Sequence, residues 1–321
     1  MLGALSSKLL ARNGPLFLYG TTPPREGSAE ELVQSAAGKL VERIRRLPLD
    51  GLIVYDIQDE SGRTNAPRPF PFMRTIDPRV YSRLLGSLTG KPVINYKSIG
   101  RLDAGQWSDW LSETYRDYGI RYLSLVGRAT SNGARYAMSL LRAYEIAAAH
   151  PGQFTLGGVA IAERHGPATS ESKRMLTKAR HGCGFFVSQA VYHSGATIRM
   201  LRDYARDCRE AGVAPNCVIL TFTPCGREKT MTFIKWLGIA VPAQTGEAIL
   251  SARNPLATSI DICRDNLREI LEQVAPGPVP LGINIESISI NKDEIDASVD
   301  LFHALTEVLA AYLPRCESRG A

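Results

Sequence analysis

The chain has 321 residues, 44% of them hydrophobic and 22% charged, with a formal net charge of +6. This composition is typical of a soluble globular protein, and no stretch approaches the roughly 18 apolar residues of a membrane-spanning helix. The modest positive charge suits a small anionic ligand, while the lack of basic runs argues against nucleic acid. Six scattered cysteines without a CxxC pair favour neither disulfides nor a metal site, and they fit a cytoplasmic protein.

Short apolar runs that end in polar residues recur along the chain, and we interpret each as a buried parallel strand. They lie at residues 16–19, 51–56, 92–97, 122–127, 155–161, 184–189, 217–222 and 281–286. Helical periodicity follows at residues 32–44, 104–118, 134–149, 170–181, 194–212 and 293–313, with several short helices within 228–274. Ser28 and Glu31 match a capping box before the first of these helices.

The alternation of strands and helices predicts an α/β fold with a parallel sheet. Eight strands in about 300 residues favour a (β/α)8 TIM barrel. Residues 1–14 would be an N-terminal extension and residues 15–315 a single barrel domain. An open doubly wound sheet is the alternative, although no GxGxxG motif follows the first strand to indicate a dinucleotide-binding unit. The long loop at residues 57–77 would be either a lid on the catalytic face or an idle surface loop.

Polar residues at or near the strand ends are the candidate functional residues, because the carboxyl ends of barrel strands share the catalytic face. The substrate-binding candidates are Tyr19, Asn95, Gln189 and Thr223, and the catalytic candidates are Asp56 and Glu286. Asp56 and Glu286 are interpreted as a general acid–base pair or as structural carboxylates that cap loops. Gln189 has amide donors and an acceptor that suit a heterocycle edge such as a pterin; alternatively, it satisfies backbone groups.

The order of several segments resembles methylenetetrahydrofolate reductases, which are (β/α)8 barrels. Residues 21–25 are similar to the Pro-Pro-Arg turn of that family, and residues 162–165 to its fifth-strand segment that ends in histidine. Residues 178–189 resemble its stretch from a lysine to a threonine and glutamine. The long second loop, Trp236 and residues 280–286 are similar to a divergent actinobacterial branch thought to work without bound flavin.

The resemblance implies hydride transfer from NADH or NADPH to 5,10-methylenetetrahydrofolate, giving 5-methyltetrahydrofolate. It implies that Gln189 binds the pterin and that Arg128, His165 and Lys178 lie at cofactor positions. His165 is otherwise a hydrogen-bonded loop histidine. Gly20 stands where the family has its proton-donating acid, so the proton would come from Glu286, Asp56 or water. FAD is expected to be absent.

Two alternatives follow from the missing acid at Gly20. The barrel could transfer a one-carbon unit between tetrahydrofolate and another substrate, with the loop at residues 57–77 shaping a second pocket. It could instead be a non-catalytic paralogue that acts as a partner subunit. The expected partner in the first two interpretations is a small-molecule folate, with no nucleic acid and no membrane, and a homo-oligomer is compatible with each.

Overall fold

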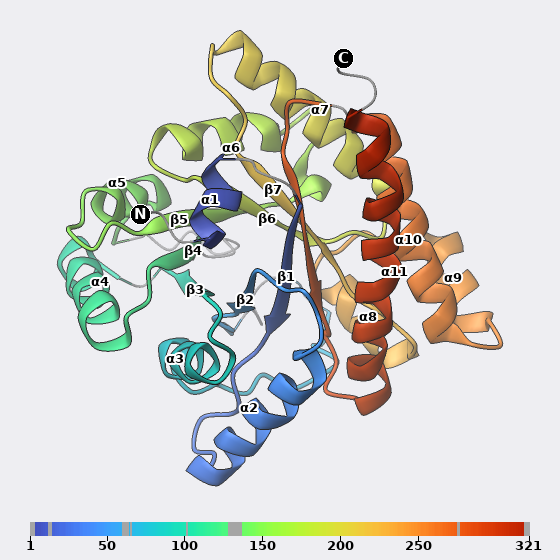
Figure 1. The fold of residues 1–321 in the computed structure, drawn as a ribbon, viewed down its shortest axis with the longest axis horizontal. Helices are drawn as coiled ribbons and strands as arrows, with labels where there is room; N and C mark the ends of the chain where they lie inside the picture. The colour runs from blue at the N-terminus through green and yellow to red at the C-terminus, as the bar shows by residue number, and fades with distance from the viewer. Residues whose placement is uncertain are drawn as a thin grey trace. The chain divides into compact units, whose positions relative to one another are not determined.

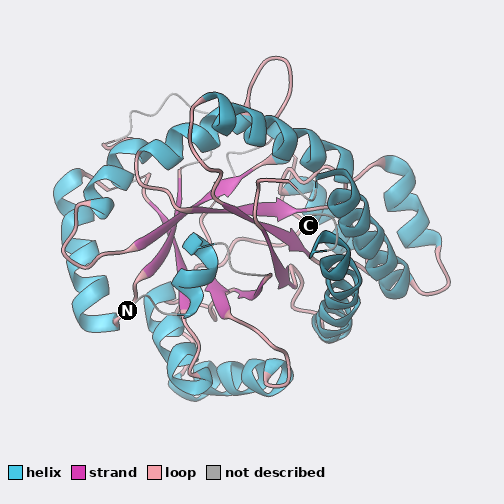
Figure 2. Cartoon of the chain, turned by 45° about the horizontal axis from the view of Figure 1, so that its top comes forward, coloured by secondary structure: helices cyan, strands magenta, loops and turns pink. Residues whose placement is uncertain are grey.

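The eight predicted strands are present and form one closed parallel barrel in chain order, which confirms the (β/α)8 fold. The computed structural model describes residues 4–11, 15–59, 64, 66–100, 102–127, 137–274 and 277–317 (Figures 1 and 2). The strands are β1 (Leu16–Thr21), β2 (Gly51–Val54), β3 (Val93–Ser98), β4 (Tyr122–Val126), β5 (Thr155–Ala160), β6 (Phe185–Ala190), β7 (Cys217–Phe222) and β8 (Leu281–Glu286).

Helices alternate with these strands along the chain (Figure 1). They are α1 (Ala4–Ala11), α2 (Glu30–Ile44), α3 (Pro78–Thr89), α4 (Ala104–Tyr118), α5 (Leu140–Ala148), the 3-10 helix η1 (Ala162–Arg164), α6 (Glu171–Arg180), α7 (Ser194–Glu210), α8 (Glu228–Trp236), α9 (Ala243–Ser251), α10 (Pro255–Val274) and α11 (Lys292–Glu317). The α1 helix lies within the segment predicted only as an extension, and α3 follows the long loop at residues 57–77.

The contacts of the chain divide it into two compact units. Unit 1 comprises Met1–Val159 with Thr177–Phe186, and unit 2 comprises Ala160–Leu176 with Val187–Ala321. In unit 1, β1 to β5 pair in parallel, with Gly20 opposite Ile53 and Val54 opposite Asn95. In unit 2, β7 pairs with β8 in parallel, and α10 packs against α7, α9 and α11.

Local capping explains the sharp ends of α4. The Asp103 carboxylate accepts from the Gln106 amide, and the Gln106 side chain returns the contact, so the capping box lies here. Gly119 then ends the helix with a φ of 66°, a left-handed conformation that favours glycine. The capping box predicted at Ser28 and Glu31 is wrong: α2 begins after Ala29 and has no side-chain cap.

The α5 helix begins later than predicted. Residues 137–139 are not helical, and the Ser139 hydroxyl accepts from the Arg142 amide to cap a helix that starts at Leu140. Residues 128–136 lie outside the described structure. The apolar periodicity that placed the start at residue 134 could not locate this cap, because a serine also suits an exposed helix position.

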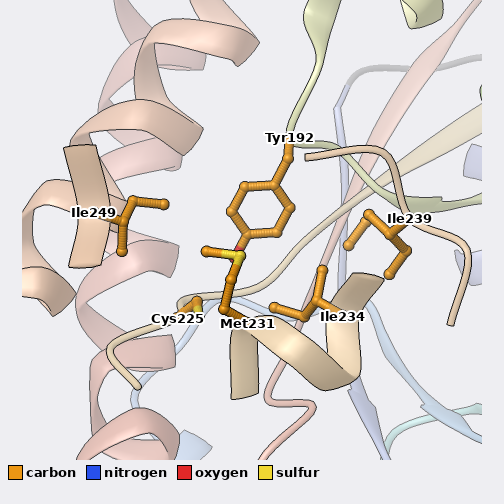
Figure 3. Close-up of a cluster of buried hydrophobic side chains, with 7 residues drawn as sticks. Tyr192, Cys225, Met231, Ile234, Ile239 and Ile249 are labelled. Carbon is orange, nitrogen blue, oxygen red and sulfur yellow. The ribbon is translucent and has the colours of Figure 1, made fainter. Parts of the chain in front are cut away.

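An apolar cluster forms part of the core of unit 2 (Figure 3). Its buried members are Ala190, Tyr192, Cys225, Met231, Ile234, Ile239 and Ile249. Figure 3 shows Tyr192 and Met231 between Ile249 on one side and Ile234 with Ile239 on the other. Full burial of an isoleucine or methionine side chain stabilises a fold by about 1.5–3 kcal/mol. The cluster therefore anchors the segment around Ile239, which follows α8.

The described residues contain no helix with the length and apolar character needed to cross a membrane. Within the same residues, no group of three histidine, cysteine, aspartate or glutamate side chains is placed to hold a metal ion. Five cysteines are buried in the structure: Cys183, Cys208, Cys217, Cys225 and Cys263.

Candidate functional site

Gly20 lies near the carboxyl end of β1, and its missing side chain leaves room for Tyr55, which follows β2. A Cβ atom on residue 20 would lie 2.7 Å from the Tyr55 hydroxyl oxygen. The Tyr55 ring meets the Tyr96 ring edge to face, with 4.8 Å between their centroids. The space beside the position that the reductase resemblance associates with an acid is thus filled by the phenol of Tyr55, just past β2.

Asp56 is held at the end of β2 by two hydrogen bonds. The backbone amide of Ser98 and the side-chain amide of Gln58 each donate to its carboxylate, both at 2.8 Å. The first bond ties the segment after β2 to the last residue of β3. These contacts fit the structural interpretation of Asp56, and its catalytic role stays a prediction.

Asn95 and Tyr19 are both buried, at 1% and 2% exposure. The Asn95 side-chain oxygen accepts from the Ser82 hydroxyl at 3.0 Å, and its amide donates to the Tyr96 carbonyl at 2.9 Å. Ser82 belongs to α3, so Asn95 faces the helix that covers its strand. Substrate binding by Asn95 and Tyr19 stays a prediction.

Of the two predicted cofactor residues of unit 1, Lys178 belongs to the described structure and Arg128 does not. Lys178 lies on α6, where its ammonium donates to the Val159 carbonyl at 2.6 Å and lies 5.9 Å from the centre of the Phe186 ring. Arg128 lies outside the described residues. The hydrogen bond of Lys178 ties α6 to β5, and its role at a cofactor position stays a prediction.

Gln189 lies near the end of β6 in unit 2 and is partly exposed. Its side-chain amide donates to the carbonyl of Leu237, just past α8, at 3.4 Å. This distance is longer than a typical N–H···O bond. The preceding Ser188 is fixed more tightly, because it donates to the Gln189 carbonyl and accepts from the Thr221 amide at 2.7 and 2.9 Å.

Glu163 lies in η1, just after β5, and approaches the same segment after α8. The backbone amide of Ala240 donates to its carboxylate at 3.4 Å. Burial raises the pKa of Glu163 above its ordinary value, against the opposing effects of backbone amides and of His193 and Arg164. A carboxylate that is hard to ionise in its own site gains from a ligand that donates hydrogen bonds to it.

His165 follows η1 and pairs with Asp203 on α7, with 2.9 Å between its Nε2 and a carboxylate oxygen. Its other nitrogen, Nδ1, is buried and has no partner among the described residues. Burial opposes the ionisation of Asp203, but hydrogen bonds from His165 and Arg206 hold its pKa below the ordinary value. These contacts fit the interpretation of His165 as a hydrogen-bonded loop histidine. Since His165 is only two residues after Glu163, its pairing with Asp203 also restrains the turn that carries Glu163.

The remaining predicted residues of unit 2 are Thr223 and Glu286. Thr223 is fully buried, and its hydroxyl oxygen has no partner within the described structure. Its backbone carbonyl accepts from the Tyr192 hydroxyl at 2.7 Å. Glu286 is the last residue of β8 and is partly exposed. Their assigned roles in substrate binding and catalysis stay predictions.

Sequence reasoning did not assign three groups that the geometry brings forward: Tyr55, Glu163 and the backbone of Leu237 and Ala240. Glu163 and Tyr55 could be found, because both lie at the end of a predicted strand. The backbone groups of Leu237 and Ala240 carry no sequence signal, since any residue presents the same amide and carbonyl.

No protein-family model matches the chain, and a search of curated proteins finds no match. Among solved structures, the chain is similar to an uncharacterized protein from Clostridium thermocellum that binds two copies of 5-methyl-5,6,7,8-tetrahydrofolic acid. The sequence identity is 32% and the TM-score is 0.81. The match covers 95% of this chain and 99% of the other.

Proposed function

Because this chain belongs to the same family as the Clostridium thermocellum protein, we propose that it binds a reduced folate, with 5-methyltetrahydrofolate as a ligand. The observation that carries the proposal is 32% identity across 95% of one chain and 99% of the other, together with the folate bound by that relative. Identity at this level over whole chains supports more than a common fold.

The pterin end of the ligand is assigned to Gln189. An amide side chain supplies donors and an acceptor, which is what the edge of a pterin requires. The contact of Gln189 with Leu237 is long, at 3.4 Å, so a ligand group with better geometry can compete for the same amide.

For the reaction, we favour the reductase that the sequence resembles. Hydride from NADH or NADPH would add to the methylene carbon of 5,10-methylenetetrahydrofolate, the bond from that carbon to N10 would break, and N10 would take a proton. The product, 5-methyltetrahydrofolate, is the ligand of the relative. Tyr55 is a better candidate proton donor than Asp56, because the Asp56 carboxylate already accepts two hydrogen bonds, and tyrosine can act as a general acid.

One-carbon transfer to or from a second substrate is the competing function. The lack of an acidic side chain at Gly20 favours it in one respect. Transfer of the methyl group from 5-methyltetrahydrofolate does not open a ring at N10, so it needs no acid at that position.

The test has two steps. Calorimetric titration with 5-methyltetrahydrofolate should show saturable binding, and its absence would refute the folate proposal. NADH or NADPH is then mixed with 5,10-methylenetetrahydrofolate and the enzyme, and nucleotide oxidation is followed. Oxidation supports the reductase, whereas folate binding without oxidation supports transfer.

The role of Tyr55 is tested within the same assay. Tyr55→Phe should lower turnover by roughly 10²–10⁴-fold if the phenol donates the proton, with folate affinity largely retained. Tyr118→Phe is the matched control, because that ring packs on Arg79 and should leave turnover unchanged. Equal rates in the two variants would exclude Tyr55 as the donor.

A further inference from the structure

Glu163 and Gln189 converge on one short segment of unit 2, residues 237–240. Gln189 donates to the Leu237 carbonyl at the start of this segment, and Glu163 accepts from the Ala240 amide at its end, both at 3.4 Å. The two side chains come from different places in the chain, near the end of β6 and in η1. A single stretch of backbone thus orients a carboxylate and an amide together.

Apolar packing holds the 237–240 segment in place. Ile239, in its middle, is only 6% exposed and belongs to the apolar cluster of Figure 3, beside Ile234. Leu237 and Val241, on either side, pack against the same cluster. Because the apolar side chains are held in the core, the polar backbone groups of Leu237 and Ala240 keep fixed positions.

The η1 turn that carries Glu163 is held on its other side by α7. His165, two residues after Glu163, pairs with Asp203 at 2.9 Å, and Asp203 is itself held by Arg206 at 2.7 Å. Glu163 is therefore constrained from both directions. This arrangement is typical of a binding residue oriented by a supporting shell.

Each contact with the 237–240 segment uses one polar atom of its side chain. A carboxylate has two oxygens and an amide has an oxygen besides its nitrogen, so both retain capacity for further hydrogen bonds. Burial disfavours the charged form of Glu163, and donors on a bound ligand would reduce that cost.

We infer that Glu163 is a ligand-binding residue. Its carboxylate accepts hydrogen bonds from the N–H groups of the folate heterocycle, and Gln189 binds the same heterocycle beside it. The inference rests on the proposed folate function and deepens it. A pterin carries an amino group and a ring N–H side by side, and a carboxylate accepts from both at once. The 237–240 segment acts on the ligand only through these two side chains.

The experiment compares two ligands on three proteins by calorimetry. The proteins are the wild type, Glu163→Gln and the control Glu247→Gln, which makes the same chemical change at an exposed position of α9. The ligands are 5-methyltetrahydrofolate and its analogue without the 2-amino group. Glu163→Gln keeps an oxygen for the Ala240 amide but replaces one acceptor with a donor.

For 5-methyltetrahydrofolate, Glu163→Gln should weaken binding roughly 10- to 100-fold, as expected for the loss of a charged hydrogen-bond acceptor. For the analogue without the 2-amino group, the same substitution should weaken binding by a much smaller factor. Glu247→Gln should bind both ligands as the wild type does. If Glu163→Gln does not fold, Glu163→Asp replaces it, with a smaller loss in the same direction.

Two results would overturn the inference while leaving the folate proposal intact. Equal weakening of both ligands by Glu163→Gln would mean that Glu163 acts only by supporting the 237–240 segment. Unchanged binding of both ligands would mean that it has no part in the site. If the wild type binds neither ligand, the folate function fails and this inference fails with it.

Discussion

A glycine at position 20 is required by its neighbour rather than by its backbone. The Tyr55 ring approaches so closely that a Cβ atom on residue 20 would lie 2.7, 2.9 and 3.1 Å from its hydroxyl oxygen and two ring carbons. The Tyr96 ring supports Tyr55 from another side. The tyrosine can therefore move away only at the expense of that aromatic contact.

Gly20→Ala should lower the free energy of unfolding by about 1–3 kcal/mol, the usual effect of overpacking. Tyr55→Phe in the same chain should recover part of the loss, because it removes the closest atom. Denaturant unfolding measures both. Gly38→Ala is the control: nothing lies within 4 Å of its Cβ position on α2, so it should stabilise by about 0.5–1 kcal/mol. If Gly20→Ala leaves the free energy of unfolding unchanged, the close approach of Tyr55 to residue 20 is contradicted.

Glu163 should reduce the stability of the protein at neutral pH. Burial raises its folded-state pKa above 4.5, so the folded protein binds the proton more tightly than the unfolded chain does. The stabilising contribution is therefore present below pH 4.5 and is lost as the pH rises through the folded pKa. Interactions with Arg164 and His193 are among those that oppose the shift.

Glu163→Gln should consequently unfold at a higher denaturant concentration than the wild type at pH 7. The difference between the two unfolding midpoints should shrink as the pH falls towards 4.5. Denaturant unfolding of both proteins at several pH values measures it. Glu247→Gln, exposed on α9, should match the wild type throughout. A Glu163→Gln variant that is less stable at pH 7 would show that the carboxylate is stabilised by its surroundings.

At the scale of elements, α3 and α4 are joined by a buried cation. The Arg79 side chain is 8% exposed and pairs with Asp77 at 2.7 Å and Glu113 at 2.9 Å. Its guanidinium also lies 4.9 Å from the Trp110 ring centre and 4.7 Å from that of Tyr118. Burial opposes ionisation of Asp77, but hydrogen bonds from Arg79 lower its pKa below 3.8.

Arg79→Met should destabilise the protein by about 2–3 kcal/mol, because it leaves two carboxylates without their shared partner. The lowered pKa of Asp77 contributes stability above pH 3.8 that is lost as the pH falls through the folded value. The difference in the free energy of unfolding between Arg79→Met and the wild type should therefore become smaller as the pH falls below 3.8. Arg142→Met, in a surface pair with Glu145, should change stability by less than about 0.5 kcal/mol. If this difference stays constant as the pH falls, the ionised Asp77 carboxylate does not contribute to the stability of the wild type.

The elements that could be predicted from sequence are those with local causes. The prediction of a helix at residues 104–118 matches α4, in which Trp107 and Leu111 are buried and which Gly119 ends. The cap of α2 could not be located, since a serine followed by a glutamate three residues later also occurs outside capping boxes. Burial of β7 on all six residues matches its continuous apolar run.

The candidate site was predictable only as far as strand ends determine it. Gln189 and Asp56 could be found because each closes an apolar run: Gln189 is the next-to-last residue of β6, and Asp56 lies two residues past β2. The partners that distinguish them could not be found: Ser98 for Asp56 and Leu237 for Gln189 are backbone contacts between segments far apart in sequence. Such contacts depend on the packing of the strands and on no local pattern.

At the scale of the molecule, the eight strands form one closed sheet. Each strand of the closed sheet has a neighbour on both sides, so local unfolding in either unit would expose unpaired strand edges. We therefore expect the chain to unfold in one cooperative transition, although its contacts divide into two compact units.

The tryptophans allow this to be tested, because they report on the units separately. Trp107 and Trp110 stack in unit 1, with 5.2 Å between their centroids, and Trp236 is 7% exposed in unit 2. Trp236→Phe leaves the unit 1 reporters, and a double Trp107→Phe, Trp110→Phe variant leaves Trp236. In each variant the fluorescence midpoint should coincide with the circular-dichroism midpoint in denaturant. Separate midpoints in either variant would show that the units unfold independently.

The same variants test whether folate stabilises the whole barrel. A ligand that binds only the folded state adds about 2.7 kcal/mol at a free concentration of about 100 times Kd. With 5-methyltetrahydrofolate at that level, the free energy of unfolding measured by fluorescence should rise by the same amount in both variants, because we expect the closed sheet to unfold in one cooperative transition. A rise confined to the Trp236 reporter would mean that folate binding stabilises unit 2 alone, where Gln189 and Glu163 lie.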